Sequence, residues 1–102
     1  MAAAPPERRV RLLRAALAEL ELAADEYDAA SPGLGDRYIA TINQAFEVIR
    51  GAPERWPRVD DRHRRFLTPR FPYSAFYRFD DVEVIVVAVA HRRRRPGYWA
   101  AR

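Results

Sequence analysis

An apolar run near the end of the chain limits the fold more than any other feature. Residues 82–90 are apolar apart from Glu83, and an aromatic stretch, residues 71–79, precedes them across Asp80 and Asp81. Such a run, rich in β-branched residues, predicts a strand that is central in its sheet or covered on both faces. The two acidic residues fit a tight connection, so the sequence predicts an antiparallel hairpin here.

Four arginines follow the apolar run, directly after His91. A strand that leaves a buried sheet has few residues in which to turn, so these guanidinium groups must face solvent or a polyanion. Aromatic residues beside cations are typical of surfaces that bind single-stranded nucleic acid or a protein partner. We therefore expect a target-binding surface made of Arg92, Arg93, Arg94, Arg95, Tyr98 and Trp99.

Two alternatives compete with this hypothesis. The arginines could form a solvated tail, and Tyr98 and Trp99 could fold back to cover the core. If the run is extended, Arg93 and Arg95 share one face, because alternate residues of an extended segment point the same way.

Charge is divided unevenly along the chain. Residues 1–49 carry a net charge of −3 and residues 50–102 carry +7, and every cation is an arginine. The basic half therefore calls for an anionic partner. Arginine suits bidentate binding of phosphate or carboxylate, although codon usage in a GC-rich genome would also explain its choice over lysine.

The length of 102 residues predicts one domain over residues 1–102. The sequence has no cysteine, and His63 and His91 are its only imidazoles, so we expect no disulfide, no metal site and no cofactor. A membrane span needs about 18 or more consecutive apolar residues, which this sequence lacks. We expect a cytoplasmic protein that does not bind membranes.

The first half of the chain predicts two helices. From Ala15 onward, apolar residues recur at helical spacing opposite an acidic face. Ser31 and Pro32 predict the N-cap and first position of the second helix. Gly51 is expected as a left-handed cap, and Pro53 as the stop. The apolar stripes are Leu17, Leu20, Ala24 and Tyr27 in the first helix, and Tyr38, Ile42, Ala45, Phe46 and Ile49 in the second.

Residues 8–13 predict a short edge strand, with a helix as the alternative, and residues 64–68 predict a further strand. The order is then strand, helix, helix, strand, strand, strand. This order predicts an α+β fold in which an antiparallel helical hairpin packs on one face of a small, mainly antiparallel sheet.

Side chains suited to catalysis are few. The sequence has no phosphate-binding loop, serine elbow or His-x-x-x-His. His91 could move a proton near a phosphate, with a purely structural role as the equal alternative. His63 is expected to be an idle surface histidine, and the pairs Asp25–Glu26 and Asp60–Asp61 are expected to be solvated.

Several segments together resemble one protein family over nearly the whole chain, from Val10 to Trp99. They are AELELAADEY (18–27), SPGLG (31–35), FPY (71–73), FYR (76–78) and HRRRRP (91–96). In this order and spacing they resemble the RelE/ParE toxin superfamily of type II toxin–antitoxin systems. The short PGYW ending and the SPGLG junction are most similar to ParE-type plasmid-stabilisation toxins.

The resemblance implies a small bacterial toxin that an acidic, partly disordered antitoxin neutralises. We expect the antitoxin to contact the helical hairpin and the adjacent sheet surface. RelE-like members cleave messenger RNA on the ribosome, whereas ParE-like members inhibit DNA gyrase and hydrolyse nothing. The residues expected to bind the antitoxin are Leu17, Leu20, Tyr27, Tyr38, Arg65 and Arg78.

One departure from the RelE pattern favours the ParE-like function. Ser74 stands where that pattern has an arginine, while Arg93 matches its arginine after the final strand and Trp99 stands opposite its tyrosine. Arginines such as Arg65 replace its lysines, and a guanidinium that stays protonated is a poor general base. The sequence therefore favours a gyrase inhibitor that is not an enzyme. The alternative is a ribosome-dependent messenger RNA endonuclease, for which the catalytic candidates are His91, Arg93 and Tyr98.

Overall fold

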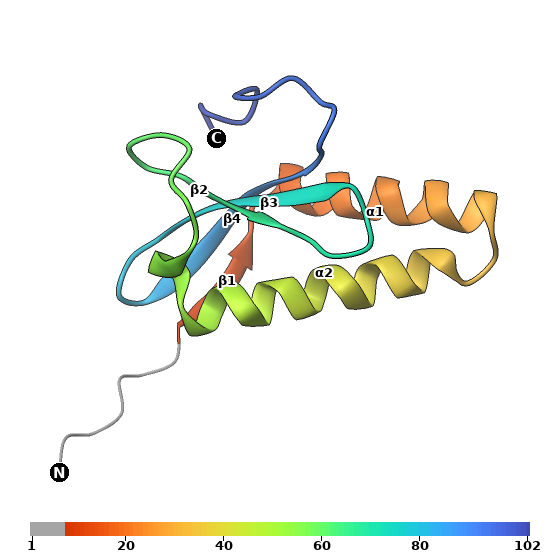
Figure 1. The fold of residues 1–102 in the computed structure, drawn as a ribbon, viewed down its shortest axis with the longest axis horizontal. Helices are drawn as coiled ribbons and strands as arrows, with labels where there is room; N and C mark the ends of the chain where they lie inside the picture. Colours follow the sequence, from red (N-terminus) through yellow and green to blue (C-terminus); the bar gives the residue numbers. More distant parts are fainter. Residues whose placement is uncertain (1–7) are drawn as a thin grey trace, which may run out of the picture.

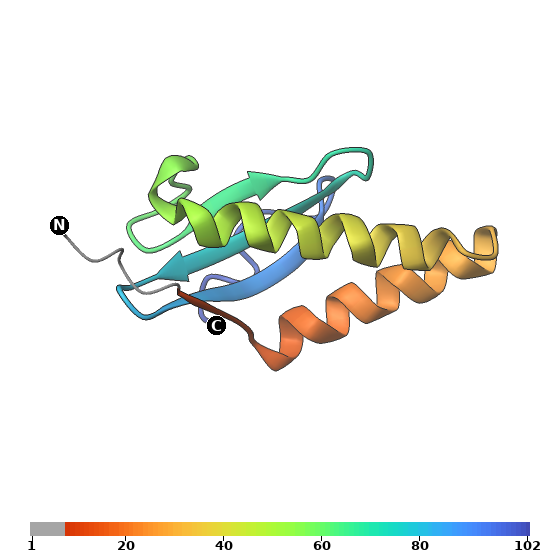
Figure 2. The same ribbon diagram turned by 90° about the horizontal axis from the view of Figure 1, so that it is seen from below.

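Two long helices, α1 (Arg14–Ala30) and α2 (Leu34–Gly51), form an antiparallel hairpin against one face of a four-stranded sheet (Figures 1 and 2). The strands of this computed structural model, which describes residues 8–102, are β1 (Arg9–Leu12), β2 (Arg64–Leu67), β3 (Tyr73–Phe79) and β4 (Glu83–His91). A short 3-10 helix, η1 (Pro53–Arg55), follows α2. The predicted α+β class and the order of elements are confirmed.

The apolar strand β4 lies inside the sheet, whose strand order is β1-β4-β3-β2. On one side it pairs in parallel with β1, with Val10 opposite Val84, and on the other it pairs antiparallel with β3, with Ala75 opposite Val89. Residues 9–12 therefore form the predicted edge strand rather than a helix. Asp80 fixes the β3–β4 turn, because its Oδ1 accepts the backbone N–H groups of Val82 and Glu83 at 2.8 Å.

Both faces of β4 are covered, which explains why its sequence is apolar throughout. On the helix side, Val84 and Val86 pack with Tyr77 and the apolar stripes of α1 and α2. On the opposite face, Val87 packs in a second core with Phe76, Ala88, Ala90 and Trp99. In Figure 1 the segment after β4 lies on the side of the sheet opposite to α2. Among the described residues, neither helix is long and apolar enough to cross a membrane.

The junction between the helices differs from the prediction. Ser31 caps the end of α1, since its N–H bonds to Tyr27 C=O, and α2 begins only at Leu34 after Gly33, whose φ is 88°. The capping carboxylate comes from the preceding helix: Asp28 Oδ1 accepts the N–H of Gly35 at 2.7 Å. Tertiary contact thus supplies the cap that Ser31 was expected to provide.

The end of α2 also differs in detail. Gly51 is the last helical residue and is not in the left-handed region, and Ala52 is the cap residue with a φ of −156°. The predicted stop at Pro53 is confirmed, because this proline begins η1. The helix ends without a left-handed residue, so the glycine is not needed for the turn.

Gly35 lies where the start of α2 closely approaches the backbone of α1. A Cβ at this position would overlap the carbonyl oxygen of Ala24 and lie 2.7 Å from Cγ of Asp28. We predict that Gly35→Ala lowers the free energy of unfolding by about 1–3 kcal/mol, the usual cost of overpacking. Urea denaturation of the purified variant measures this loss.

Gly51→Ala is the matched control, because a Cβ there has nothing within 4 Å. Replacing this glycine should leave stability unchanged or raise it by up to about 1 kcal/mol, since alanine loses less chain entropy in a helix. Equal stability of the two alanine variants would contradict the close approach at Gly35.

Candidate functional site

Residues 92–102, which we call the return segment, reverse direction after β4 and lie across the second face of the sheet. The reversal is a turn in which Arg94 N–H bonds to His91 C=O at 2.9 Å and Arg93 N–H bonds to His91 Nδ1 at 3.0 Å. The arginine run is therefore not extended. Arg93 and Arg95 do not share a face by alternation, as the sequence had suggested.

Trp99 is a core residue. Its ring stacks on Phe76 at a centroid distance of 4.5 Å and meets the edge of His63 at 4.9 Å, and only 3% of the residue is exposed. Its predicted place in the target-binding surface is corrected, and the alternative, folding back onto the core, is what the structure shows. The burial of Trp99 has a physical reason: its ring removes from water the side of Phe76 that the helices do not cover.

The carboxylate of Glu19 holds the return segment in place from α1. It accepts hydrogen bonds from Tyr98 Oη at 2.6 Å, Arg102 Nη1 at 2.9 Å and Arg94 Nη1 at 3.1 Å. It also accepts the Val89 N–H of β4 at 3.2 Å. Because its side chain is only 13% exposed, these charge-assisted bonds are little screened by solvent.

Further contacts of three arginines strengthen this connection. Arg102 Nη1 also donates to Val87 C=O at 3.0 Å, and Arg78 Nη1 donates to the carbonyl of Arg102 at 2.9 Å. The guanidinium of Arg94 lies over the Tyr98 ring, 3.6 Å from its centroid. Arg78 is therefore engaged inside the molecule, and its contact with an antitoxin stays a prediction.

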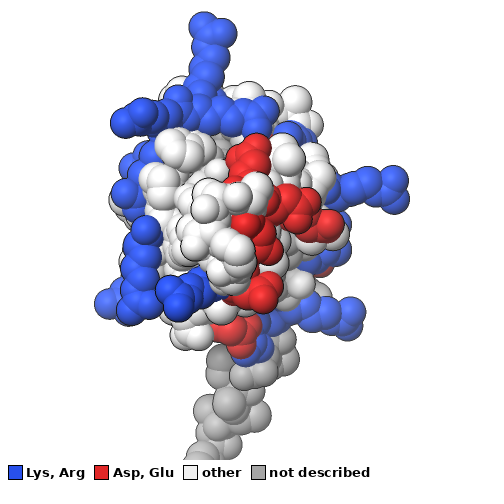
Figure 3. All heavy atoms as spheres, turned by 90° about the vertical axis from the view of Figure 1, so that its right-hand side faces the viewer, with Lys and Arg blue, Asp and Glu red and all other residues white. Residues whose placement is uncertain are grey.

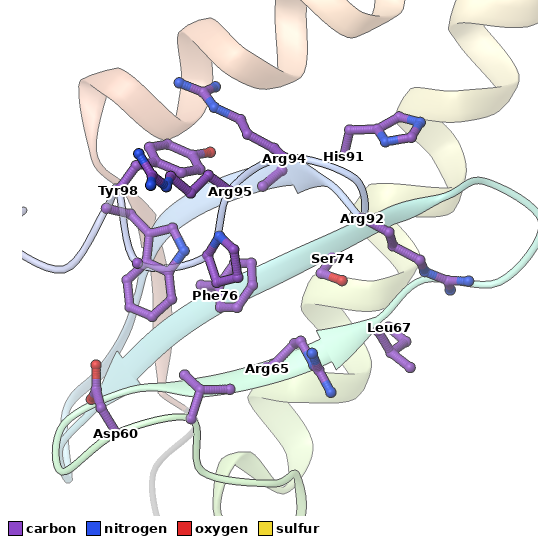
Figure 4. Close-up of a pocket in the computed structure, with 15 residues that line it drawn as sticks. Asp60, Arg65, Leu67, Ser74, Phe76, His91, Arg92, Arg94, Arg95 and Tyr98 are labelled. Atoms are coloured by element: carbon purple, nitrogen blue, oxygen red, sulfur yellow. The ribbon is translucent and has the colours of Figure 1, made fainter.

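A cleft of about 530 Å³ opens between the return segment and strands β2 and β3 (Figure 4). β2 contributes Arg65 and Leu67, and β3 contributes Ser74 and Phe76. Four arginines line the cleft, and we call them the cleft arginines: Arg65, Arg92, Arg94 and Arg95. Arg93 is not among the lining residues.

The cleft carries a net positive charge. Asp60 is its one acidic lining residue, and the Asp60 carboxylate is already bonded to the backbone N–H groups of Arg62 and His63. These bonds, with that of the Arg62 N–H the largest cause, lower the pKa of Asp60 below its ordinary value. The site is thus suited to an anion, because its donors outnumber its acceptors.

The cleft arginines differ in how firmly they are held. Arg92 Nη2 donates to Thr68 C=O at 3.0 Å, and Arg94 is bound to Glu19. Within residues 8–102, no side-chain hydrogen bond or ion pair engages Arg65, Arg93 or Arg95. These three exposed guanidinium groups can bind a partner without first breaking an internal bond.

The candidate proton carriers are engaged in structural contacts. His91 Nδ1 accepts the Arg93 N–H, and its ring packs against Tyr73 at 5.2 Å and points away from Ser74 and Arg95 in Figure 4. Tyr98 donates to Glu19, and burial together with this bond raises the pKa of its phenol. Neither group is placed as a free general base in the cleft.

His63 corrects a second prediction. It is buried, with 2% exposure, and its Nδ1 lies 2.9 Å from both carboxylate oxygens of Asp60. His63 is therefore not an idle surface residue: its ring packs against Trp99 and bonds to Asp60 in the loop before β2. Asp60 and Asp61 are exposed as predicted, as are Asp25 and Glu26, and the Asp60 carboxylate has the additional role of holding the His63 ring.

Some of the residues expected to bind an antitoxin are buried, and others are exposed. Leu20 and Tyr38 are core residues with 6% and 0% exposure, and Tyr27 is half-buried against Tyr38, so these side chains support the hairpin rather than present a surface. Leu17 is 44% exposed, and Arg65 is exposed in the cleft.

The helical end of the molecule is acidic. Figure 3 views the end where α1 meets α2 and shows carboxylates gathered at its centre with arginines around them. Exposed acids on these helices include Asp25, Glu26, Asp28 and Asp36. An acidic partner is repelled there and attracted to the cleft.

Sequence inspection missed Glu19 and Arg102 because their partners lie far apart in the chain. Glu19 lies among several acids of α1, and nothing in its spacing separates it from them. Among residues 8–102, no group of histidine and acidic side chains is arranged to hold a metal ion.

We predict that Glu19→Gln loosens the return segment, because the neutral amide removes the ion pairs with Arg94 and Arg102. The expected loss of stability is about 1–3 kcal/mol, as for hydrogen bonds to charged groups. In a Trp56→Phe background, the fluorescence of Trp99 should shift to longer wavelength and become accessible to acrylamide.

Glu47→Gln serves as the control, since Glu47 forms an exposed ion pair with Arg50 on α2. Such surface pairs contribute about 0–1 kcal/mol, so the emission of Trp99 should not change. A Glu19→Gln protein with the parent's emission and quenching would show that the carboxylate does not hold the segment.

Comparison with known proteins identifies a family and related solved structures. A family model described as "ParE toxin of type II toxin-antitoxin system, parDE" matches residues 10–96. A solved chain described as "Chromosomal ParDE TA system from P. aeruginosa" superposes with a TM-score of 0.74 at 18% sequence identity, covering 83% of this chain and 96% of that one. No curated protein sequence matches the chain.

Proposed function

Because the chain belongs to the family of ParE toxins of type II toxin–antitoxin systems, we propose that it inhibits DNA gyrase by binding, without hydrolysing nucleic acid. The observation that carries this proposal is a cleft lined by four arginines, in which His91 Nδ1 and the Tyr98 hydroxyl already form internal hydrogen bonds. Arginines bind phosphate or carboxylate, but cleavage of RNA also requires a group that removes a proton from the attacking hydroxyl.

Three details support binding over hydrolysis. Tyr98 donates its phenol proton to Glu19, and burial together with this bond raises the pKa of the phenol above its ordinary value. The imidazole of His91 accepts the Arg93 N–H. Ser74 stands where the RelE pattern has an arginine. It lines the cleft but is buried, with 4% exposure.

We assign target binding to Arg93 and Arg95, with Arg92 and Arg94 as held neighbours that add positive charge. Arg93 and Arg95 are the two members of the run without a side-chain partner within residues 8–102. Tyr98 contributes through the placement of Arg94 above its ring. The proposed target-binding surface is thus the turn after β4. We place the protein in the cytoplasm, where it would meet gyrase.

A cognate acidic antitoxin is the second proposed partner. Two features support it: the basic second half of the chain, and the structural likeness to a chain described as part of a ParDE toxin–antitoxin system. An acidic, partly disordered polypeptide could wrap the cleft side of the molecule, where the charge is complementary.

The alternative function, cleavage of messenger RNA on the ribosome, is supported by the positive cleft alone. We predict that the purified toxin blocks supercoiling by gyrase and traps cleaved DNA, while primer extension shows intact messages. Cuts in translated messages together with normal supercoiling would favour the endonuclease and overturn the proposed target.

We further predict that replacing both Arg93 and Arg95 with alanine abolishes growth inhibition. The stability should change by no more than about 0.5 kcal/mol, because both side chains are exposed and unpaired. Growth assays and thermal melts of the double variant measure these two outcomes.

The control replaces Arg14 and Arg37 with alanine, which removes the same charge from exposed helical positions. This variant should remain toxic. If the Arg93 and Arg95 variant is as toxic as this control, the target must bind elsewhere on the protein.

A further inference from the structure

The loop between β2 and β3 contains a residue with a strained backbone. Arg70 has a φ of 69°, and within residues 8–102 it is the one non-glycine residue whose φ is positive. A side chain in this left-handed conformation lowers stability, and glycine avoids most of that loss because it has no Cβ. Arg70 is therefore held in this conformation by its surroundings, and residues held in this way are concentrated at functional sites.

Hydrogen bonds fix the loop from within. Thr68 is only 1% exposed, and its Oγ1 donates to Tyr73 C=O at 2.7 Å and lies 3.2 Å from the carbonyl oxygen of Phe71. Two tight backbone turns follow, in which the Phe71 N–H bonds to Pro69 C=O and the Tyr73 N–H bonds to Phe71 C=O, each at 2.8 Å. Pro69 also has a fixed φ, so the chain next to Arg70 has little freedom to relax.

Aromatic packing fixes the same loop to the helical hairpin. The Phe71 ring meets the ring of Tyr27 at a centroid distance of 5.1 Å and that of Tyr38 at 5.3 Å. Neighbouring antiparallel strands can be joined by a two-residue turn, whereas residues 68–72 join β2 to β3. The loop is thus longer and more firmly held than a simple connection requires.

Arg92 fixes the loop to the turn after β4. Its backbone N–H donates to Pro72 C=O at 2.8 Å, and its Nη2 donates to Thr68 C=O at 3.0 Å. In Figure 4 the Arg92 side chain extends toward the β2–β3 loop. The loop and the arginine run therefore lie side by side at one end of the sheet.

The Arg70 side chain takes part in none of these contacts. It is exposed, and within residues 8–102 no hydrogen bond or ion pair engages its guanidinium. The surroundings fix the backbone of Arg70 and leave its charge available to a partner. A charge presented on a rigid loop binds without an ordering cost, as Arg93 and Arg95 do in the function proposed above.

We propose that Arg70 is a further target-binding residue, which extends the surface of Arg93 and Arg95 to the β2–β3 loop. The inference rests on the proposed inhibition of gyrase and adds a residue and a ligand group to it. That group is a carboxylate on the gyrase surface, which a guanidinium can bind through two parallel hydrogen bonds.

The neighbouring aromatic residues favour a protein carboxylate over a nucleic-acid phosphate. Surfaces that bind single strands offer aromatic rings on which bases stack. Here the Trp99 ring is stacked on Phe76, and the Tyr98 ring is covered by the guanidinium of Arg94. Neither ring is open to a base beside the arginine run.

Two substitutions separate the charge of Arg70 from its backbone conformation. Arg70→Gln removes the charge and keeps a side chain at the strained position, whereas Arg70→Gly removes the charge and relieves the strain. Both should raise the toxin concentration that half-inhibits supercoiling by roughly tenfold or more, and both should weaken binding to DNA-free gyrase to the same extent. In thermal melts, Arg70→Gln should match the parent, and Arg70→Gly should melt at the same temperature or higher.

Arg62→Gln is the matched control, because Arg62 is an exposed loop arginine that precedes β2 and so lies at the other end of this strand. It loses the same charge at a position that the proposal leaves outside the binding surface. Its half-inhibitory concentration should stay within about twofold of the parent's, since charges away from the contact act weakly.

Three results overturn the proposal. The first is parent-like inhibition by Arg70→Gln. The second is an Arg70→Gly protein that melts below the parent, because Arg70 would then stabilise the loop instead of being held by it. The third is weaker inhibition with parent-like binding to DNA-free gyrase, which would place the contact on DNA phosphate.

The parent toxin separates this inference from the function on which it rests. If the parent does not inhibit gyrase, the proposed function is wrong. If the parent inhibits gyrase and Arg70→Gln inhibits it equally well, the function stands and only Arg70 is removed from the binding surface.

Discussion

The Glu19 carboxylate is the contact on which the functional half of the molecule depends. It lies on α1 and joins that helix to β4 through Val89 and to the return segment through Arg94, Tyr98 and Arg102. Each of these donors would lose its charged acceptor if the carboxylate were removed. The cleft has the return segment as one wall, so its shape follows from a residue that does not line it.

The bonds to Glu19 also hold the layer that covers the second face of β4. A strand that is apolar on both faces needs two covering layers, and the part of the chain that the structure describes supplies one helical hairpin, which covers one face. The second layer is the return segment, with Trp99 stacked on Phe76. Burying a large apolar side chain contributes about 1.5–3 kcal/mol, and in the return segment this adds to the bonds that Arg94, Tyr98 and Arg102 make with Glu19.

Charge divides the surface into an acidic side and a basic side. Acids cover the end where the helices meet, whereas the cleft and the turn after β4 are rich in arginine (Figures 3 and 4). Internal bonds hold Arg92 and Arg94 in place, and Arg65, Arg93 and Arg95 have none within residues 8–102. Held charges keep such a surface in shape, and charges without an internal partner can bind a ligand without a rearrangement cost.

The sequence by itself determined the elements. Period and composition located the two helices, the hairpin of β3 and β4 and the edge strand β1, because local periodicity reports which face of an element is buried. The segments that resemble RelE/ParE toxins also pointed to the family. The basic turn after β4 was visible as well, since four successive arginines cannot be buried.

Only the tertiary structure decided which of those residues are free to act. Trp99 and His63 are buried by partners from distant strands and loops, and Asp28 supplies the cap expected from Ser31. The sequence does not distinguish Glu19 from the other acids of α1, because its partner Arg102 lies far along the chain, after β4. The physical reason is common to all of them: periodicity describes one element, whereas burial, capping and ion pairing depend on which elements meet.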